Sequence, residues 1–194
     1  KTGFYLDQKL NHTAIRDWAV KLEKKTALDL FTYQGGFGLH LAAAGISVLG
    51  VDQSDDALSF AMKNAEKNKL SANFRTLKAD IFEWIRTDTE KYDVVVLDPP
   101  SLVGVRENID NAMRALIDLH SYALDRLKWG GILVSCTCSQ AFTEEILTKV
   151  VRESAHSRRR QVRVLERRGP APDHAPMPNF IEGDYLRCYV IQVD

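Results

Sequence analysis

The stretch TALDLFTYQGGFG, residues 26 to 38, decides the fold of this chain. Its first part, TALDLF (26–31), is a short apolar run that predicts a buried strand, and LHLAAA (39–44) predicts the helix that follows. Between them, Gly35 and Gly36 permit a tight turn and let the backbone come close to a ligand. The turn lacks the GxGxxG dinucleotide pattern, which weakens a dehydrogenase hypothesis and leaves a cofactor loop and an ordinary turn open.

Outward from this stretch, strand and helix patterns alternate along the chain. Further helices are predicted over 14–22, 58–65, 81–85, 109–127 and 143–154, and further strands over 46–52, 74–80, 92–98, 131–136, 162–166 and 185–193. Repeated alternation predicts a Rossmann-like α/β fold, with a mostly parallel seven-stranded sheet and helices on both faces. No helix pattern separates the last two strands, so we expect them to pair antiparallel at one edge.

The composition bounds the class of protein. The 194 residues suit one domain with a hydrophobic core, spanning 1–194. The 26 basic and 26 acidic side chains cancel, so a nucleic-acid site would have to be local. The apolar runs are too short to cross a membrane, and three cysteines, an odd number, favour a reducing compartment, so we expect a cytoplasmic location. The chain begins KTGFYLDQ, without Met, and we expect it to be a fragment of a longer protein.

In such a sheet, ligands bind outside the carboxyl ends of the strands, so the residues after each strand are candidates for a site. Asp52 ends the second strand, where a carboxylate can accept both hydroxyls of a ribose. Asp80 and Ile81 follow the third strand and place a carboxylate beside an apolar group, as an adenine site requires. For both acids a helix cap is the alternative, although Ser54 already serves that need after Asp52.

A third acid, Asp98, follows the most apolar strand and precedes Pro99 and Pro100. Two prolines remove two backbone donors and fix a rigid turn. A rigid turn that carries a carboxylate is suited to holding a planar base.

Two cysteines, Cys136 and Cys138, stand one residue apart at the end of the fifth strand. Structural zinc sites prefer Cys-x₂₋₄-Cys with two more ligands, and only Cys188 is left elsewhere, so we expect no metal site. We expect Cys136 to be a core residue, because free cysteine is often buried. Cys138 should face the ligand cleft, on the side where Asp98 emerges.

These features, in this order, resemble the class I S-adenosylmethionine-dependent methyltransferases. The resemblance implies S-adenosylmethionine as cofactor, with the glycine turn holding its methionine and ribose part, Asp52 the ribose and Asp80 the adenine. The full cofactor-binding set that we carry over is Tyr33, Gly35, Gly36, Phe37, Asp52, Gln53, Ser54, Asp80, Ile81, Asp98 and Pro99.

A narrower resemblance covers nearly the whole chain. The stretches TGFYLDQ (2–8), LDLFTYQGGFG (28–38), LDPPS (97–101), SCTCS (135–139) and APDH (171–174) look like the large-subunit ribosomal RNA 5-methylcytosine methyltransferase family. That resemblance implies rRNA processing, an RNA partner, Cys138 as the nucleophile and an N-terminal PUA-type RNA-binding domain upstream. It implies no membrane partner and leaves a homodimer open.

The chemistry of such a reaction explains the residues. Carbon-5 of cytosine is a weak nucleophile until a thiolate adds to carbon-6 and makes the ring enamine-like. We therefore expect Cys138 to form a covalent adduct with cytosine and Asp98 to stabilise it at the N3 and amino edge of the ring.

Other readings stay open. An adenine N6 or other amine methyltransferase acting on nucleic acid or protein also uses an acid or amide before two prolines, but would leave Cys138 without a task. A non-catalytic methyltransferase-fold module that binds cofactor or RNA, or a small-molecule methyltransferase, are further alternatives. The basic run HSRRRQVRVLERR (156–168) could contact phosphates or be a solvated edge. His120 is expected to be a satisfied core histidine rather than a substrate contact, and His174 and Cys136 have no assigned role.

Overall fold

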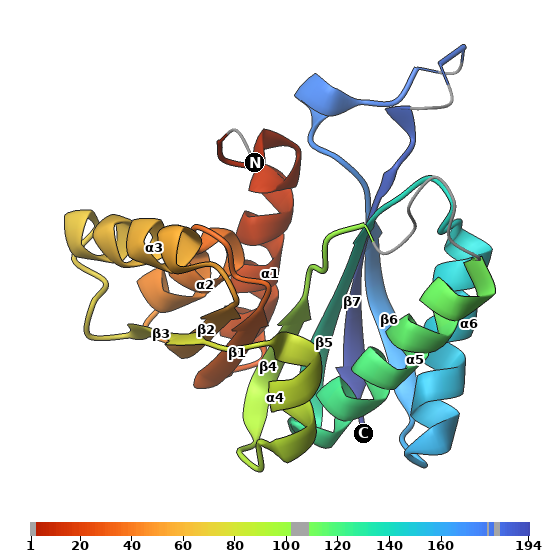
Figure 1. The fold of residues 1–194 in the computed structure, drawn as a ribbon, viewed down its shortest axis with the longest axis horizontal. Coiled ribbons are helices and arrows are strands. Elements are labelled where there is room, and N and C mark those ends of the chain that lie inside the picture. Colours follow the sequence, from red (N-terminus) through yellow and green to blue (C-terminus); the bar gives the residue numbers. More distant parts are fainter. Residues whose placement is uncertain (1–2, 102–108, 178, 181–182) are drawn as a thin grey trace.

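The computed structural model describes residues 3–101, 109–177, 179–180 and 183–194, so Thr2 of the TGFYLDQ stretch lies outside them. The described residues form a single seven-stranded sheet in the order β3-β2-β1-β4-β5-β7-β6 (Figure 1). The strands are β1 (Thr26–Leu30), β2 (Ser47–Asp52), β3 (Phe74–Lys78), β4 (Tyr92–Leu97), β5 (Leu127–Cys138), β6 (Val162–Arg168) and β7 (Leu186–Val193). The predicted strand count and α/β class are confirmed.

The strand directions also follow the prediction. Strands β1 to β5 are parallel, and β6 pairs antiparallel with β7 at one edge of the sheet. Because β7 also runs antiparallel to β5, the reversed strand lies second from the edge, between two strands that share the common direction.

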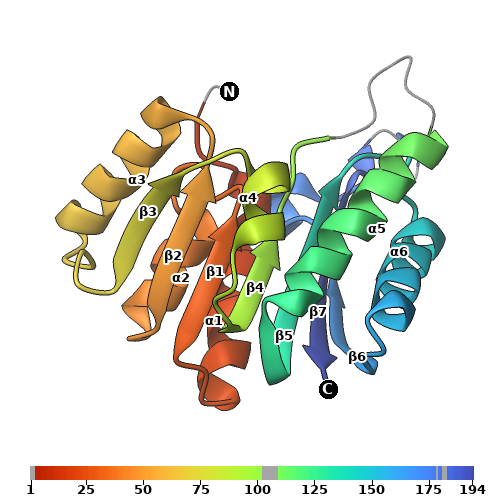
Figure 2. The same ribbon diagram turned by 60° about the horizontal axis from the view of Figure 1, so that its bottom comes forward.

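Helices cover both faces of the sheet (Figure 2). The helices are α1 (Lys9–Lys21), α2 (Gly36–Ala43), α3 (Asp55–Lys67), α4 (Ile81–Thr87), α5 (Ile109–Asp125) and α6 (Glu144–Ser157), with short 3₁₀ turns η1 (Leu6–Gln8) and η2 (Pro172–His174). Side chains of α1, α2 and α3 pack into one core, and those of α4, α5 and α6 pack into another on the opposite face.

Several boundaries differ from the sequence prediction by a few residues, and two of the differences have a clear physical cause. Helix α1 begins at Lys9 rather than at residue 14, because its first turn buries the polar side chains of Asn11 and His12, which apolar periodicity does not mark. Leu127 starts β5 rather than ending the preceding helix, since it pairs with Tyr92 across the sheet. Helix α6 is capped by Thr143, whose hydroxyl accepts from the Ile146 N–H at 3.3 Å.

The pleat of β5 aims both cysteines at the same face of the sheet. Ile132, Val134 and Cys136 belong to the core under α1 and α2, whereas Leu133 belongs to the opposite core. Since side chains alternate along a strand, Cys138 at the end of β5 shares the α1 and α2 face with Cys136.

A bulge changes the facing of β6. Val164 pairs with Ile191 and Glu166 pairs with Val190, so Leu165 is an extra residue in the ladder. A one-residue shift moves every later side chain to the other face of a sheet. Val164 therefore packs into the α5 and α6 core, while Glu166 points toward α1, where it accepts from the Trp18 indole N–H at 2.7 Å.

Across the residues that the structure describes, no helix is both long enough and apolar enough to cross a membrane.

Candidate active site

A cavity of about 350 Å³ opens at the carboxyl ends of β1, β4 and β5. It is lined by Phe4, Tyr5, Asp7, Gln8, His12, Asp29, Phe31, Thr32, Tyr33, Gly36, Phe37, Asp98, Pro99, Pro100, Ser101, Cys138, Tyr185 and Leu186. This is the edge where ligands of parallel α/β sheets bind, and the volume suits a small-molecule site.

The cavity brings together part of the predicted site. Among the residues expected from the sequence, it is lined by Tyr33, Gly36, Phe37, Asp98, Pro99 and Cys138. The described lining of the cavity does not include the other predicted cofactor residues, which are Gly35, Asp52, Gln53, Ser54, Asp80 and Ile81. Their proposed contacts with a cofactor stay predictions, and several of them have structural roles that are described below.

The turn after β1 is strained in the way that functional turns often are. Phe31 and Tyr33 adopt the left-handed region with φ of 63° and 50°, and Gly35 follows at 86°. A non-glycine residue held there costs about 1 kcal/mol or more and persists only where the surroundings fix it. Here the surroundings include Asp29, whose carboxylate accepts from the Thr32 hydroxyl at 2.6 Å and from the Gly38 N–H at 2.8 Å.

Asp29 is a buried brace between β1 and α2 that sequence reasoning missed. Burial raises its pKa to about 6, although the hydrogen bonds from Thr32 and Gly38 lower it. The carboxylate lies against Gly38, where an added Cβ would sit 2.9 Å from Asp29 Oδ2 and 2.6 Å from Phe74 Cε2. The glycine at this position is thus required by close packing.

Asp52 ties the same turn to β2. Its Oδ2 accepts from the Tyr33 N–H and its Oδ1 from the Ser54 N–H, both at 3.0 Å. Each carboxylate oxygen has a second lone pair, so these bonds leave acceptor capacity for a ribose hydroxyl. Ser54 caps α3, as the sequence suggested, by accepting from the Ala57 N–H at 3.3 Å.

Asp80 acts as a helix cap in the structure, which was the alternative interpretation. Its Oδ1 accepts from the Glu83 N–H at 3.1 Å at the start of α4. Ile81 is buried in the core between the sheet and α4, α5 and α6, with 3% of its surface exposed.

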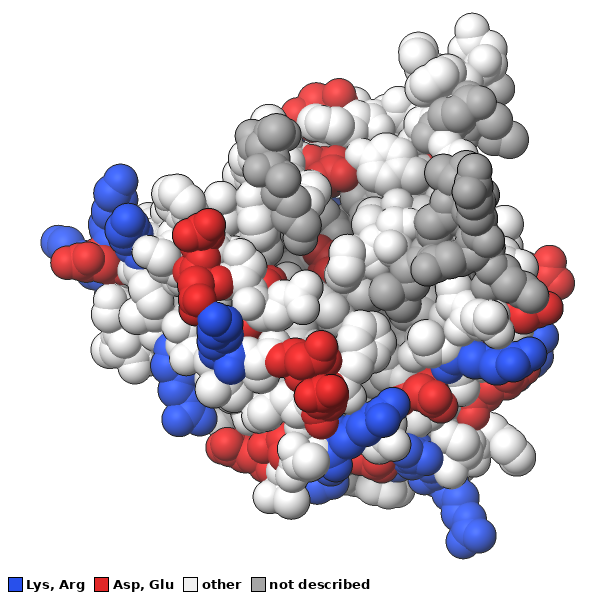
Figure 3. All heavy atoms as spheres, viewed as in Figure 1, with Lys and Arg blue, Asp and Glu red and all other residues white. Residues whose placement is uncertain are grey.

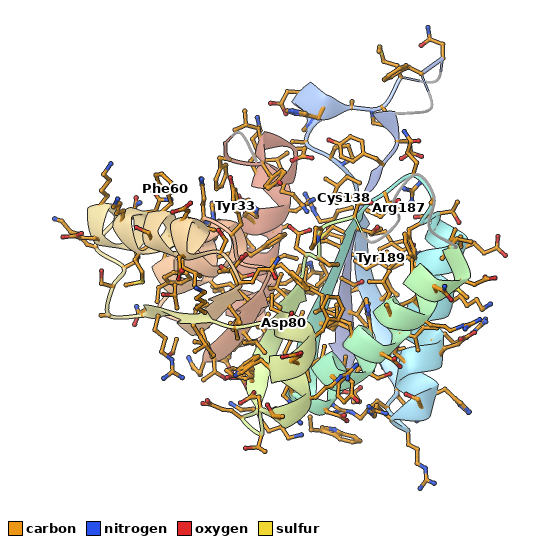
Figure 4. The ribbon with its side chains drawn as sticks, in the orientation of Figure 1. Tyr33, Phe60, Asp80, Cys138, Arg187 and Tyr189 are labelled. Atoms are coloured by element: carbon orange, nitrogen blue, oxygen red, sulfur yellow. The ribbon has the colours of Figure 1, made fainter. Side chains whose placement is uncertain are left out.

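The predicted catalytic pair meets at the cavity. The Cys138 thiol is exposed and donates to the Pro99 carbonyl at 3.8 Å, which places it beside the turn that carries Asp98. Figure 4 shows Tyr33 on the turn after β1 and Cys138 at the end of β5, on opposite sides of this site. The sheet thus brings a thiol and a carboxylate from two neighbouring strands to one cavity.

The N-terminal segment forms a wall that sequence reasoning missed. The Gln8 amide N–H₂ donates to Asp98 Oδ1 at 3.3 Å, and the Asp7 carboxylate accepts from the Tyr185 hydroxyl at 2.7 Å. The Ala171 N–H donates to the Asp7 carbonyl at 2.8 Å, so η1 lies against the segment between β6 and β7. In Figure 1 these two segments stand side by side above the strand ends.

His12 is a further residue that sequence reasoning missed. Only 3% of the residue is exposed, and its Nδ1 has no hydrogen-bond partner among the described residues. A Cβ added at Gly36 would sit 2.8 Å from the His12 ring, so the glycine lets the turn rest on this histidine. Burial first, and the nearby His40 second, lower the pKa of His12 to about 3, so the ring is neutral at pH 7.

The cavity is acidic rather than basic. Its described lining includes Asp7, Asp29 and Asp98 and contains no Lys or Arg. In Figure 3, Lys and Arg side chains gather toward the lower and left edges of the visible face, and the charged groups around the hollow near the top are acidic. Such a cavity favours a cationic or neutral ligand over a phosphate.

The basic run is mostly committed to internal contacts. Arg158 pairs with Asp125 at 2.8 Å, and Arg168 pairs with Glu166. The Arg160 guanidinium donates to the backbone carbonyls of Leu124, Leu127, Lys128 and Asp194. The structure therefore favours the interpretation of this run as a structural edge over that of a phosphate-binding surface.

Two further expectations are confirmed. His120 is fully buried and satisfied, with Nδ1 2.8 Å from the Leu116 carbonyl and Nε2 2.7 Å from the Ser135 hydroxyl. Cys136 is buried directly opposite Cys188 across β5 and β7, and burial together with Cys188 raises the pKa of its thiol. Both thiols are free, and within the described ranges no cluster of three or more metal-ligating side chains occurs.

Comparison with known proteins places this geometry in context. Residues 21–169 match the family model described as a methyltransferase domain. The ribosomal RNA large subunit methyltransferase I of Escherichia coli strain K12 is 35% identical over 198 residues, which cover 100% of this chain and 49% of that protein. This chain therefore spans about half the length of the curated relatives that it matches.

Solved structures share the fold. A putative methyltransferase solved in complex with SAH superimposes with a TM-score of 0.81 at 22% identity, covering 97% of this chain and 50% of that one. The complex of aTrm5 with tRNA(Leu) gives a TM-score of 0.67 at 20% identity, covering 100% of this chain and 48% of that one.

Proposed function

This chain belongs to the methyltransferase domain family and has the class I fold, and from that premise we propose that it is an S-adenosylmethionine-dependent RNA methyltransferase that forms 5-methylcytosine in large-subunit ribosomal RNA. The observation that carries the proposal is the meeting of the Cys138 thiol and the Asp98 turn in one cavity at the strand ends. A methyl transfer to nitrogen or oxygen would leave that thiol without a role.

The residues of the cavity fit the cofactor. S-adenosylmethionine carries a sulfonium and an ammonium group, which suit a cavity lined by Asp7, Asp29 and Asp98 without a described Lys or Arg. Gly36 and the neutral ring of His12 also line the cavity, and the buried Nδ1 of that ring has no partner among the described residues. When bound, the cofactor supplies the methyl group as an electrophile.

Tyr33, Gly35, Gly36 and Phe37 hold the cofactor from the turn after β1. Asp52 lies one hydrogen bond from that turn and is placed to accept ribose hydroxyls, with Gln53 and Ser54 beside it. Asp80, Ile81 and Pro99 complete the set that we assign to the cofactor.

Cys138 carries the chemistry in two steps. Its exposed thiol loses a proton to solvent, and the thiolate sulfur adds to carbon-6 of the cytosine, so that electrons of the 5,6 double bond become available at carbon-5. After carbon-5 has gained the methyl group, a base removes the carbon-5 proton, the double bond re-forms and the thiolate leaves with its electron pair. The thiol is exposed to the cavity at the end of β5, as this attack requires.

Asp98 stabilises the adduct. Its carboxyl lies on a turn stiffened by Pro99 and Pro100, which prevents the group from swinging away from a bound base. A protonated Asp98 donates to N3 of the ring as negative charge develops there, which is general acid catalysis.

The RNA assignment rests on relatives. The Escherichia coli relative is named as a ribosomal RNA methyltransferase, and aTrm5 shares this fold and is seen with tRNA. The acidic cavity accepts a base rather than the backbone, so phosphate contacts come from elsewhere on the protein, including the RNA-binding domain expected upstream.

The test is methyl transfer from labelled S-adenosylmethionine to ribosomal RNA that lacks the modification. Cys138→Ala should lower the rate at least about a thousandfold, because the nucleophile is gone. Cys136→Ala is the matched control, since that thiol is buried on the same strand and should retain activity. RNA containing 5-fluorocytidine should trap a covalent complex with the wild-type chain, because fluorine cannot leave as a proton does.

The outcomes separate the alternatives. 5-methylcytosine that disappears with Cys138→Ala supports the proposal. Activity that survives Cys138→Ala would refute the covalent mechanism and favour an amine methyltransferase. Cofactor binding without a trapped adduct in any RNA would favour a module that binds without turnover.

A further inference from the structure

We propose that Gln8 is a positioning residue for Asp98, and that Arg168 sets its orientation through Asn11. The four side chains form one line of hydrogen bonds from the edge strand β6 to the cavity. Arg168 Nε donates to Asn11 Oδ1 at 2.9 Å, Asn11 Nδ2 donates to Gln8 Oε1 at 2.7 Å, and Gln8 Nε2 donates to Asp98 Oδ1 at 3.3 Å.

The direction of this line follows from chemistry. A guanidinium has only donors, so the oxygen of Asn11 must face Arg168. The NH₂ group of Asn11 must then face away, where it meets two acceptors, Gln8 Oε1 and the Gly169 carbonyl at 3.1 Å. That contact fixes the oxygen of Gln8, so its NH₂ group is left to face Asp98.

Burial makes this orientation costly to reverse. Gln8 is 3% exposed and Asn11 is 1% exposed, so water cannot replace a lost partner. Turning either amide would set donor against donor and leave a buried polar group unpaired, which is unfavourable. The permanently charged arginine therefore dictates which end of a glutamine meets the candidate catalytic carboxylate.

The anchor of the line depends on the bulge at Leu165. Without the bulge, regular alternation through Leu165 would point Glu166 and Arg168, like Val164, at α5 and α6. With it, both face α1, where Glu166 holds the guanidinium of Arg168 and accepts from Trp18. Strand β6 is thus connected to Asp98 through hydrogen bonds, although none of its residues lines the cavity.

The consequence for Asp98 is a constraint on where its proton sits. An N–H group pointing at Oδ1 stabilises the carboxylate form and disfavours a proton on that oxygen. Tyr5 from the N-terminal segment couples electrostatically to Asp98 and to Cys138. Cys136 on β5 also couples to Asp98. This inference rests on the proposed function for the use of that proton, but the line itself is independent of turnover.

The test is an NMR titration of the aspartate side-chain carbons, with Asp98 assigned from the signal missing in Asp98→Asn. Gln8→Leu should raise the pKa of Asp98 by about one unit, a tenfold gain in proton affinity, because the donor is gone. Gln161→Leu, an exposed glutamine before β6, is the matched control and should leave the titration unchanged.

A double-variant cycle tests the line. Asn11→Leu should raise the pKa of Asp98 in the same direction by about half a unit, and Gln8→Leu with Asn11→Leu should match Gln8→Leu alone, since Asn11 acts through Gln8. Gln8→Met preserves length and packing and replaces Gln8→Leu if that variant fails to fold.

An unchanged titration in a folded Gln8 variant would overturn the proposal, and additive effects of Gln8 and Asn11 would overturn the relay. Because the titration needs no RNA, its result is separate from the test of the proposed function. If the pKa of Asp98 shifts in the Gln8 variant but the chain forms no 5-methylcytosine, the proposed function is refuted and the positioning role of Gln8 stands.

Discussion

At the residue scale, the turn after β1 shows how a few atoms fix a site. Gly38 has no side chain because Asp29 and Phe74 occupy that space, and Asp29 in turn accepts from the Gly38 N–H. The missing side chain at Gly38 thus serves packing beneath the turn.

Gly38→Ala should destabilise the chain by about 1–3 kcal/mol, because the new Cβ would overpack against two buried side chains. Urea unfolding measures the change. Gly169→Ala is the control, since a Cβ there would meet only the Leu186 carbonyl at 3.8 Å. Equal unfolding midpoints for the two variants would contradict the overpacking argument.

His12 predicts an acid dependence. Its pKa is lowered to about 3 in the folded chain and is near 6.5 in the unfolded chain, so the unfolded state binds more protons between these values. Stability should therefore fall as the pH falls from about 6.5 toward 3, by at most about 1.4 kcal/mol per pH unit from this group. Urea midpoints measured from pH 7 to pH 4 should fall less steeply in His12→Asn.

Two other fully buried groups with shifted pKa values titrate in this window. His120, with a pKa lowered to about 4 by burial, adds a slope of the same sign. Asp29, with a pKa raised to about 6 by burial, stabilises the fold when protonated and loses that contribution as the pH rises from about 4 to 6, which is the opposite sign. A slope in His12→Asn as steep as in the wild type would show that His12 is not the neutral group described.

At the element scale, the arginines of β6 and the turn before it join elements rather than forming a surface. Arg160 connects the end of α5, the start of β5 and Asp194, because its guanidinium donates to four backbone carbonyls in these segments. A sequence shows the cluster of charges but not which carbonyls lie within reach.

Arg160→Ala should lower the free energy of unfolding by about 1–3 kcal/mol, because three partly buried carbonyls and one exposed carbonyl lose a charged donor. Arg152→Ala on the exposed side of α6 is the control and should stay within about 0.5 kcal/mol. Thermal and urea unfolding measure both. A loss of RNA affinity in Arg160→Ala at unchanged stability would instead assign this arginine to the phosphate backbone.

At the scale of the whole molecule, the two ends of the chain close the cavity together. The segment before α1 contacts the segment between β6 and β7 through Asp7, Tyr185 and Ala171. These contacts span most of the chain, so the cavity forms only when the sheet is complete.

Tyr185→Phe should loosen this closure, because it removes the donor to Asp7 and leaves the ring in place. Loss of a hydrogen bond worth about 1 kcal/mol should speed amide exchange of Ala171, whose N–H bonds the Asp7 carbonyl, about fivefold. Tyr122→Phe on α5, remote from the cavity, is the control. Unaltered exchange at Ala171 would show that the two segments are held by other contacts.

The fold was readable from the sequence because its signals are local. Apolar runs, the glycine turn and the missing helix before β7 predict strand number and direction, and strand ends locate Asp98 and Cys138. Gln8 and His12 were not readable, since each is a polar residue in a helical start whose partners lie far along the chain. Asp80 shows the converse, because a carboxylate after a strand fits a ligand and a helix cap equally well.

The facing of β5 has a practical consequence. Cys136 and Cys188 are buried and Cys138 is exposed, so the chain has a single accessible thiol, and it stands in the cavity. A maleimide dye or nitroxide should therefore attach at one known point in the unaltered sequence. The natural chain carries its own reporter position, from which fluorescence or spin-label spectra could follow occupation of the cavity.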